Sequence, residues 1–129
     1  MHGFKDEAGL ATMEGLEVQL VSLGSFQLTM VLVGQAFSAG ADVIVSIEGP
    51  WSLEAQGRIL DECPDGTLAD LDAIHVNRLL GKTLERVEVV NASELRLHFE
   101  AGVTIRWRDD DPRYETGRIS LADGSEMVF

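Results

Sequence analysis

The residues of this chain that could carry chemistry are few and far apart in the sequence. Three histidines occur, at positions 2, 75 and 98, and none has a cysteine or a second histidine at the spacing of a zinc site. His98 lies between Leu97 and Phe99 in an alternating segment, so its ring is expected on the polar face of a strand. A general base or a metal ligand at His98 is one interpretation. A cross-strand polar ladder with Thr104 and Arg106 is the interpretation that the pattern favours.

Two acidic segments, Asp61-Glu62-x-x-Asp65 and Asp109-Asp110-Asp111, form the second group of candidate functional residues. A calcium ion needs six or more oxygen ligands, but consecutive acidic residues point to different sides of the chain, and no downstream glutamate closes a loop of suitable length. We therefore expect both segments to be solvated loops. Because they occupy corresponding places near the ends of the two repeats, they are the predicted contact surface for a partner: Asp61, Glu62 and Asp65 in the first half, and Asp109, Asp110 and Asp111 in the second.

Nucleophiles and phosphate-binding loops are not recognisable in the sequence. None of the eight serines stands in a Gly-x-Ser-x-Gly context, and the segment from Gly34 to Gly40 lacks the Lys-Ser or Lys-Thr of a nucleotide-binding loop. Cys63 follows Glu62, whose charge disfavours a thiolate, and a single cysteine cannot form an internal disulfide. The sequence therefore predicts a non-enzymatic protein without cofactor or metal, in a reducing cytoplasm.

A pattern that occurs twice indicates how the elements around these residues are arranged. Gly57-Arg58-Ile59 precedes Asp65-Gly66, and Gly117-Arg118-Ile119 precedes Asp123-Gly124. Before each of these Gly-Arg-Ile motifs lie two apolar, strand-like runs. They cover Phe26 to Val33 and Val43 to Trp51 in the first half, and Leu95 to Phe99 and Val103 to Trp107 in the second. The repetition predicts a duplicated β-unit of about 60 residues.

Within each unit, apolar residues recur at every second position, as in strands that bury one face. We expect one mainly β (α+β) domain over residues 1–129, built from two tandem four-stranded antiparallel meanders, at about 15–66 and about 81–129. A helix over about 67–80, ending at Gly81, is expected to join them. The two meanders would pack as a sandwich or form one curved sheet. Further expectations are a strand from Trp51 to Leu60 with a kink at Gly57, and a bulge within Leu84 to Val90.

The net charge of −12 is unevenly divided between the halves. Residues 1–66 carry 10 acidic and 2 basic residues, a net charge of −8, and residues 67–129 carry 12 and 8, a net charge of −4. Such a field repels nucleic acid and anionic lipid and attracts basic surfaces, although solubility alone also explains it. No run of 18 apolar residues suggests a transmembrane helix, and the first residues lack the pattern of a signal peptide.

Three motifs of the second half carry a resemblance. They are Leu79-Leu80-Gly81-Lys82-Thr83-Leu84, then Leu95-Arg96-Leu97-His98-Phe99-Glu100-Ala101-Gly102, then Tyr114-Glu115-Thr116-Gly117-Arg118-Ile119. This half resembles a widespread kind of small, acidic bacterial domain. Several such domains resemble immunity proteins, which protect a bacterium from secreted toxins. The resemblance covers residues 79–121 and, more faintly, 15–60. A Trp often follows the Tyr-Glu in such domains, whereas Thr116 stands there in this chain.

The resemblance implies no catalytic residues and a toxin as partner. Together with the charge, it leads us to expect a protein-binding module, an immunity-type inhibitor that masks a basic toxin or nuclease surface. One alternative is a self-associating structural module, a homodimer that pairs through the edge formed by Met127, Val128 and Phe129. Another is an inhibitor that mimics nucleic acid. Neither nucleic acid nor a membrane is expected as a partner.

Overall fold

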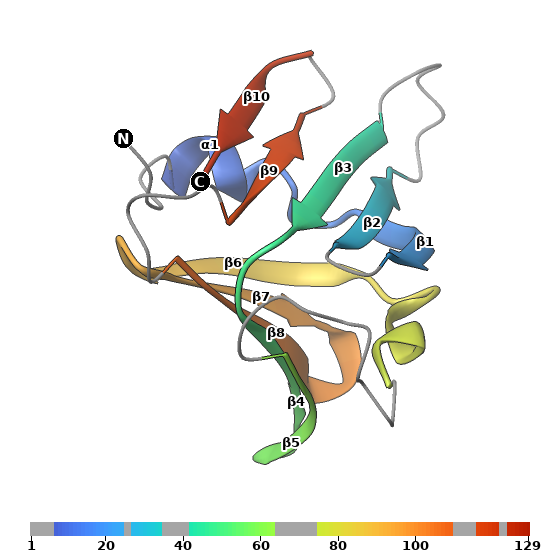
Figure 1. Cartoon of the computed structure of the whole chain (residues 1–129). Coiled ribbons are helices and arrows are strands. Elements are labelled where there is room, and N and C mark those ends of the chain that lie inside the picture. The colour runs from blue at the N-terminus through green and yellow to red at the C-terminus, as the bar shows by residue number, and fades with distance from the viewer. Residues whose placement is uncertain (1–6, 25–26, 35–41, 64–74, 110–115, 122–123) are drawn as a thin grey trace.

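The computed structural model describes residues 7–24, 27–34, 42–63, 75–109, 116–121 and 124–129. These residues form ten β-strands in two five-stranded antiparallel sheets, which face each other across one hydrophobic core (Figure 1). The prediction of a mainly β fold is confirmed, and the sandwich is the arrangement observed. In the described part of the chain, no helix is long and apolar enough to cross a membrane.

The two sheets draw their strands from both halves of the chain. Sheet A has the order β1-β2-β3-β9-β10, with β1 (Glu17–Leu23), β2 (Leu28–Val33), β3 (Asp42–Ile47), β9 (Gly117–Ser120) and β10 (Glu126–Val128). Sheet B has the order β5-β4-β8-β7-β6, with β4 (Trp51–Ala55), β5 (Arg58–Cys63), β6 (Leu84–Asn91), β7 (Glu94–Phe99) and β8 (Val103–Arg108). The short helical elements are α1 (Glu7–Ala11), η1 (Val76–Leu79) and η2 (Glu100–Gly102).

The strand orders confirm the repetition but correct its form. Strands β1 to β3 of the first half and β6 to β8 of the second each form one side of a sheet, and the closing hairpin of each half lies in the opposite sheet. The halves are therefore five-stranded units that exchange hairpins, and the prediction of two independent four-stranded meanders is wrong. The exchange has a physical reason, because a small separate sheet leaves its apolar face in water, whereas exchanged hairpins tie both sheets to one core.

The two Gly-Arg-Ile motifs occupy different places in this topology. Gln56 and Gly57 have φ angles of 53° and 77° and form the turn between β4 and β5, so the predicted kinked strand is a hairpin. Gly117 instead opens β9, opposite Ile47 of β3. In the symmetric strand order the counterpart of Gly117 is Trp51, which opens β4 opposite Trp107.

The link between the halves is only partly described, because residues 67–74 of the predicted helix lie outside the described residues. Its described end is η1, a 3₁₀ helix of four residues, so the predicted α-helix is wrong there. Val76 and Leu79 of η1 are buried in the core. Gly81 has a φ of 80°, the conformation predicted for the residue that ends the element. The predicted bulge in β6 is confirmed by a register shift between Leu84 and Arg86.

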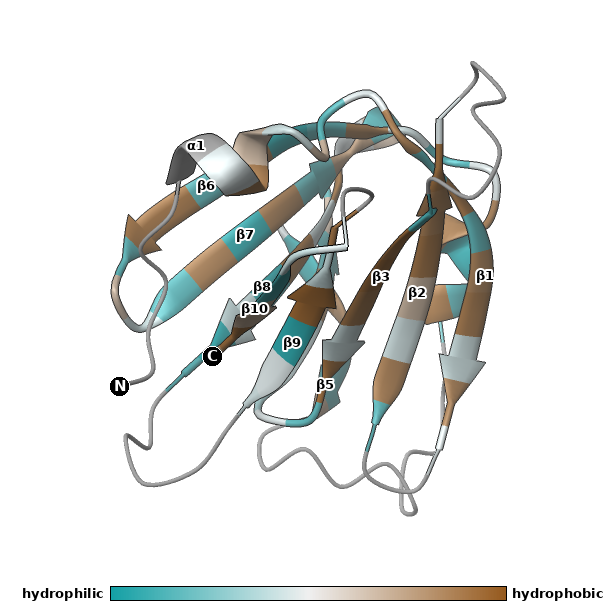
Figure 2. Ribbon diagram, turned by 90° about the horizontal axis from the view of Figure 1, so that it is seen from above, coloured by the Kyte–Doolittle hydropathy of each residue, from teal (hydrophilic) through white to brown (hydrophobic). Residues whose placement is uncertain are grey.

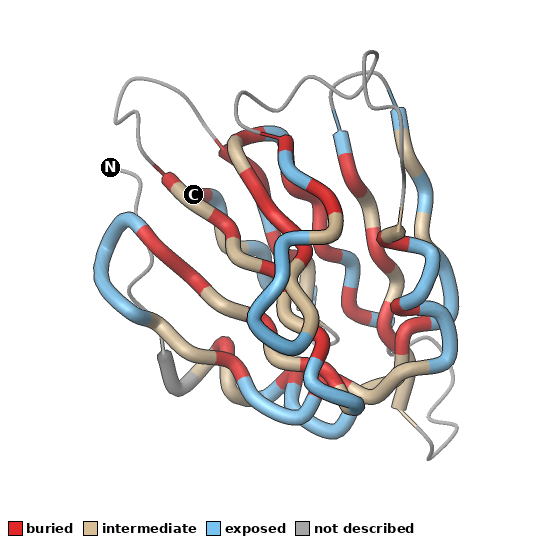
Figure 3. Tube along the Cα trace, turned by 90° about the horizontal axis from the view of Figure 1, so that it is seen from below, coloured by how far each residue is buried: buried red, intermediate tan, exposed pale blue. Residues whose placement is uncertain are grey.

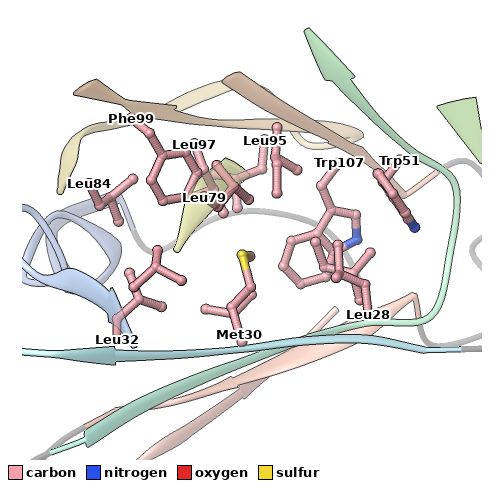
Figure 4. Packing of buried hydrophobic residues seen from close by; sticks show 14 of the residues in the cluster. Leu28, Met30, Leu32, Trp51, Leu79, Leu84, Leu95, Leu97, Phe99 and Trp107 are labelled. Carbon is pink, nitrogen blue, oxygen red and sulfur yellow. The ribbon is translucent and has the colours of Figure 1, made fainter. Parts of the chain in front are cut away.

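The core is filled from both sheets by alternate strand residues. Leu28, Met30 and Leu32 of β2 face Leu97 and Trp107 of sheet B, together with other buried side chains (Figure 4). All five are exposed by 1% or less, so each contributes about 2 kcal/mol or more of burial free energy. Burial of this kind fixes which face of each strand remains outside.

The sheets are also joined by backbone contacts at one edge. The amide of Gly15 donates to the carbonyl of Leu84 (2.7 Å), and the amide of Leu84 donates to the carbonyl of Leu16 (2.8 Å). Beside them, the amide of Val18 donates to the carbonyl of Lys82 (2.9 Å). The start of β1 is therefore held against the start of β6, which closes one corner of the sandwich.

The chain passes between the sheets at a crossing where two glycines leave little space. The amides of Glu48 and Gly49, between β3 and β4, both donate to the carbonyl of Thr116, at 2.7 and 2.9 Å. A Cβ on Gly49 would lie 2.6 Å from the Cβ of Thr116. A Cβ on Gly117 would collide with the carbonyl oxygen of Ser46 and lie 2.6 Å from the ring of Trp107. Backbones this close require glycine.

This crossing gives a prediction for stability. We expect Gly117→Ala to lower the free energy of unfolding by about 3 kcal/mol, because the new methyl group must displace backbone of β3 and the ring of Trp107. The matched control is Gly57→Ala, where nothing lies within 4 Å and only left-handed backbone strain of about 1 kcal/mol is added. Urea titration followed by tryptophan fluorescence measures both. Equal losses would contradict the role given to the crossing.

Candidate functional site

The outer face of sheet A carries an aliphatic row. By strand register Leu20 pairs with Val31, and Val31 pairs with Ile44, so the three side chains stand side by side on β1, β2 and β3. Leu20 and Ile44 are 49% and 40% exposed, and Val31 is partly exposed. Hydrophobic residues predominate along β2 and β3 in the view from above (Figure 2). A contiguous aliphatic surface of this kind is a common feature of protein-interaction sites.

A bulge in β1 creates this row. Strict alternation from Val18 would place Leu20 in the core, but the register shifts between Val18 and Leu20, so that Gln19 is the extra residue. Leu20 therefore faces out, and Val21 turns to the inner side opposite Met30. Alternation in the sequence alone groups Leu20 with Val18 on one face and does not predict this placement.

Carboxylates border the aliphatic row and form an acidic rim of Glu17, Asp42 and Glu126. Glu17 and Asp42 both pair with Val33. Val33 lies two residues after Val31, on the same face of β2, so these two carboxylates stand next to the aliphatic row. Glu126 lies at the opposite edge on β10, where Arg118 approaches it at 3.4 Å. The strands of sheet A thus hold three acidic residues and one basic residue. The face combines an apolar centre with a negative border.

The outer face of sheet B is different, because its charges pair with one another. Along β7 and β8, in the middle of this sheet, buried and partly buried residues alternate (Figure 3). Glu94 accepts hydrogen bonds from Arg96 Nε at 2.7 Å and from Arg106 Nη2 at 2.9 Å. Partial burial raises the pKa of Glu94, but the hydrogen bonds and charges of the two arginines outweigh it and leave that pKa lowered. The paired charges form a polar layer over β6, β7 and β8.

His98 belongs to this polar layer, as the ladder interpretation predicted. Its Nε2 lies 2.8 Å from Glu88 Oε1, and its Nδ1 lies 3.1 Å from Thr104 Oγ1. The hydrogen bond to His98 is the main cause that lowers the pKa of Glu88, and Arg86 adds to it. Hydroxyl, imidazole and carboxylate follow the order of a nucleophilic triad. Thr104, however, lies on β8, which pairs on both sides, so backbone amides there serve the sheet and offer no oxyanion hole.

A second histidine is part of a structural cap. The side chain of Asp61 is fully buried, and its carboxylate accepts hydrogen bonds from the amides of His75 and Val76. The Nδ1 atom of His75 lies 2.9 Å from the same carboxylate. Asp61 therefore fastens the start of η1 to β5. Such use of a side chain at the start of a helical turn satisfies amides that otherwise have no acceptor.

The predicted acidic contact residues are only partly supported by their positions. Asp61 and Asp109 are 3% and 7% exposed, so burial removes both from the surface that a partner could reach, and their assignment is corrected. Glu62 is exposed on β5. Asp65, Asp110 and Asp111 lie outside the described residues. The aliphatic row is the surface that the sequence interpretation missed, although Val31 and Ile44 stand at otherwise polar strand positions and are a readable signal.

The fold defines this chain as an antiparallel β-sandwich of two exchanged halves. In comparison with known proteins, no family model matches the chain, and neither a curated protein nor a solved structure matches it. Its function is therefore inferred from the geometry of its own surface.

The contribution of Glu94 to the polar layer can be tested through the pH dependence of the free energy of unfolding. Its pKa is lowered in the folded state, so its contribution to stability is complete above the unfolded pKa of about 4.3 and is lost as the pH falls through the folded value. We expect Glu94→Gln to lower the free energy of unfolding at pH 7 by about 1 to 3 kcal/mol. Urea titrations at several pH values should show a smaller acid-dependent loss for this variant. Glu85→Gln, on the exposed side of β6, is the control and should follow the parent protein.

The capping role of Asp61 can be tested by comparing its substitution with that of its sequence neighbour Glu62. We expect Asp61→Ala to destabilise the fold by about 2 kcal/mol, because two amides and the His75 ring lose a buried acceptor. Glu62→Ala, on the exposed side of the same strand, should change stability by less than about 0.5 kcal/mol. Thermal unfolding measures both. A similar melting temperature for the two variants would contradict the capping role.

Proposed function

We propose that this chain is a non-enzymatic protein-binding module that docks a basic protein on the outer face of sheet A, as an immunity-type inhibitor. The observation that carries the proposal is the exposed aliphatic row of Leu20, Val31 and Ile44, which has no covering element among the described residues. Interfaces place such apolar residues at the centre and polar residues at the rim. The opposite face, with its charges already paired, offers less to a partner.

Charge supports a basic partner. The row is bordered by the acidic rim of Glu17, Asp42 and Glu126, and β1 to β3 come from the half of the chain with a net charge of −8. A nuclease surface that binds phosphates is basic, so an acidic protein is steered toward it and associates rapidly. Rapid association is what protection from a toxin requires.

Self-association remains the second candidate, because the same aliphatic row could pair two copies. The predicted edge at the end of the chain is less suited to it. Phe129 is buried and packs edge-on against Trp107, with ring centroids 5.3 Å apart, and Val128 alone of the three residues is exposed. Two copies that meet through sheet A would bring like charges together, so salt should strengthen that contact, whereas salt weakens binding to a basic protein.

The test compares two faces of the same protein. Leu20→Ser with Ile44→Ser alters the aliphatic row, and Ile59→Ser with Val90→Ser alters exposed aliphatic residues of sheet B as the matched control. A partner captured from the host lysate by the parent protein is purified and titrated against both double variants. We expect the first to weaken binding about 100-fold, as for two hot-spot residues, and the second to change it less than about threefold.

Four further results test the proposed face and distinguish it from self-association. The captured partner should be basic, and raising the salt concentration from 50 to 200 mM should weaken its binding, in line with screening of the acidic rim. Equal affinity of the two double variants would contradict the proposed face. A dimer with a mass of twice 14.1 kDa, measured by light scattering, whose population rises with the salt concentration would favour self-association instead.

A further inference from the structure

A cavity opens at one end of sheet B, away from the outer face of sheet A. It has a volume of about 470 Å³ and lies between the β4–β5 hairpin, η1 and the turn that joins β7 to β8. Its walls have two characters. Ala55, Leu60 and Val103 form an apolar side, and the basic residues of the cavity are Arg58, Arg78 and Lys82.

The three basic residues have no acidic partner within the described residues. Arg86, Arg96, Arg106 and Arg118 each lie within 4 Å of a carboxylate, whereas Arg58, Arg78 and Lys82 make no ion pair or side-chain hydrogen bond there. The chain contains 22 acidic residues and only 10 lysines and arginines. With carboxylates in such excess, three basic side chains without a carboxylate partner around one cavity are unexpected. Three like charges repel one another, and a bound anion relieves that repulsion.

Two hairpin turns border the same cavity. In the described segments, the non-glycine residues with positive φ are Gln56, at 53°, and Ala101, at 64°. Both line the cavity, each in one of the two turns that border it. Hairpin turns require residues in this conformation, so the two turns fix the border of the cavity at these positions.

We propose that this cavity binds a small organic phosphate that carries an apolar group. Guanidinium and ammonium groups donate charge-assisted hydrogen bonds to phosphate oxygens, and three cations more than neutralise the negative charge of a phosphate monoester, which is about −2. The apolar side of the cavity takes up the organic group. A volume of 470 Å³ falls within the range of small-molecule sites, which is about 300 to 1,000 Å³. This ligand class is independent of the protein-binding face on sheet A.

The experiment uses defined probes and isothermal titration calorimetry on the whole chain. Phenyl phosphate is the principal probe, inorganic phosphate lacks the apolar group, benzoate replaces the phosphate by a carboxylate, and benzylamine reverses the charge. We expect phenyl phosphate to bind with a Kd of about 1 mM or below, inorganic phosphate and benzoate to bind at least about tenfold more weakly, and benzylamine not to bind.

Charge-matched variants locate the site. We expect Arg78→Gln and Lys82→Gln each to weaken binding of phenyl phosphate by about tenfold or more, because each removes one charge-assisted contact. Arg86→Gln removes the same charge from the outer face of sheet B and should leave the Kd within about twofold. Circular dichroism checks that all three variants fold. Loss of binding in Arg86→Gln as well, or equal binding of benzoate and phenyl phosphate, would overturn the proposal, as would the absence of binding by the parent chain.

Discussion

The close packing of backbone at the crossing between the sheets determines the rest of this structure. There Gly117 lies against Ser46 and the ring of Trp107, and the carbonyl of Thr116 accepts two amides from the segment between β3 and β4. Because no side chain separates the strands, β3 can pair with β9 on one side of the crossing while β4 pairs with β8 on the other. Each half can then place its closing hairpin in the opposite sheet, and both sheets share one core.

Much of the fold could be predicted from local signals, but the exchange of hairpins could not. Alternation of apolar residues identified most strands, because burial of one face requires a period of two. Pairing between β3 and β9 joins segments far apart in sequence, and apolar strands of equal period offer no preference between near and distant partners. The repeated Gly-Arg-Ile motif was misleading, because glycine serves a positive-φ turn at Gly57 and a close approach at Gly117, and the two uses look alike in sequence.

The candidate site was harder to predict, for two reasons that concern single residues. Asp61 looked like a surface acid, but its hydrogen-bond donors lie 14 and 15 residues later, where no local pattern points back to it. Leu20 looked like a core residue until the bulge at Gln19 turned it outward. A shift of one residue reverses the faces of a strand. The predicted contact of His98 with Thr104 is confirmed, because hairpin register alone places the two residues opposite each other. By contrast, Arg106 is no partner of His98 among the described residues, and the contact with Glu88 of β6 was not predicted.

The exchanged hairpins also bear on how the protein is made. During synthesis β3 and β4 emerge from the ribosome long before β8 and β9, so one side of each waits without a hydrogen-bonding neighbour. Such unpaired edges are prone to join other chains, and sheets with distant pairings fold slowly. The nascent first half is also the more acidic, with a net charge of −8, and mutual repulsion keeps neighbouring copies apart during that interval. We expect the uneven charge of the chain to limit association between nascent copies before the second half is made.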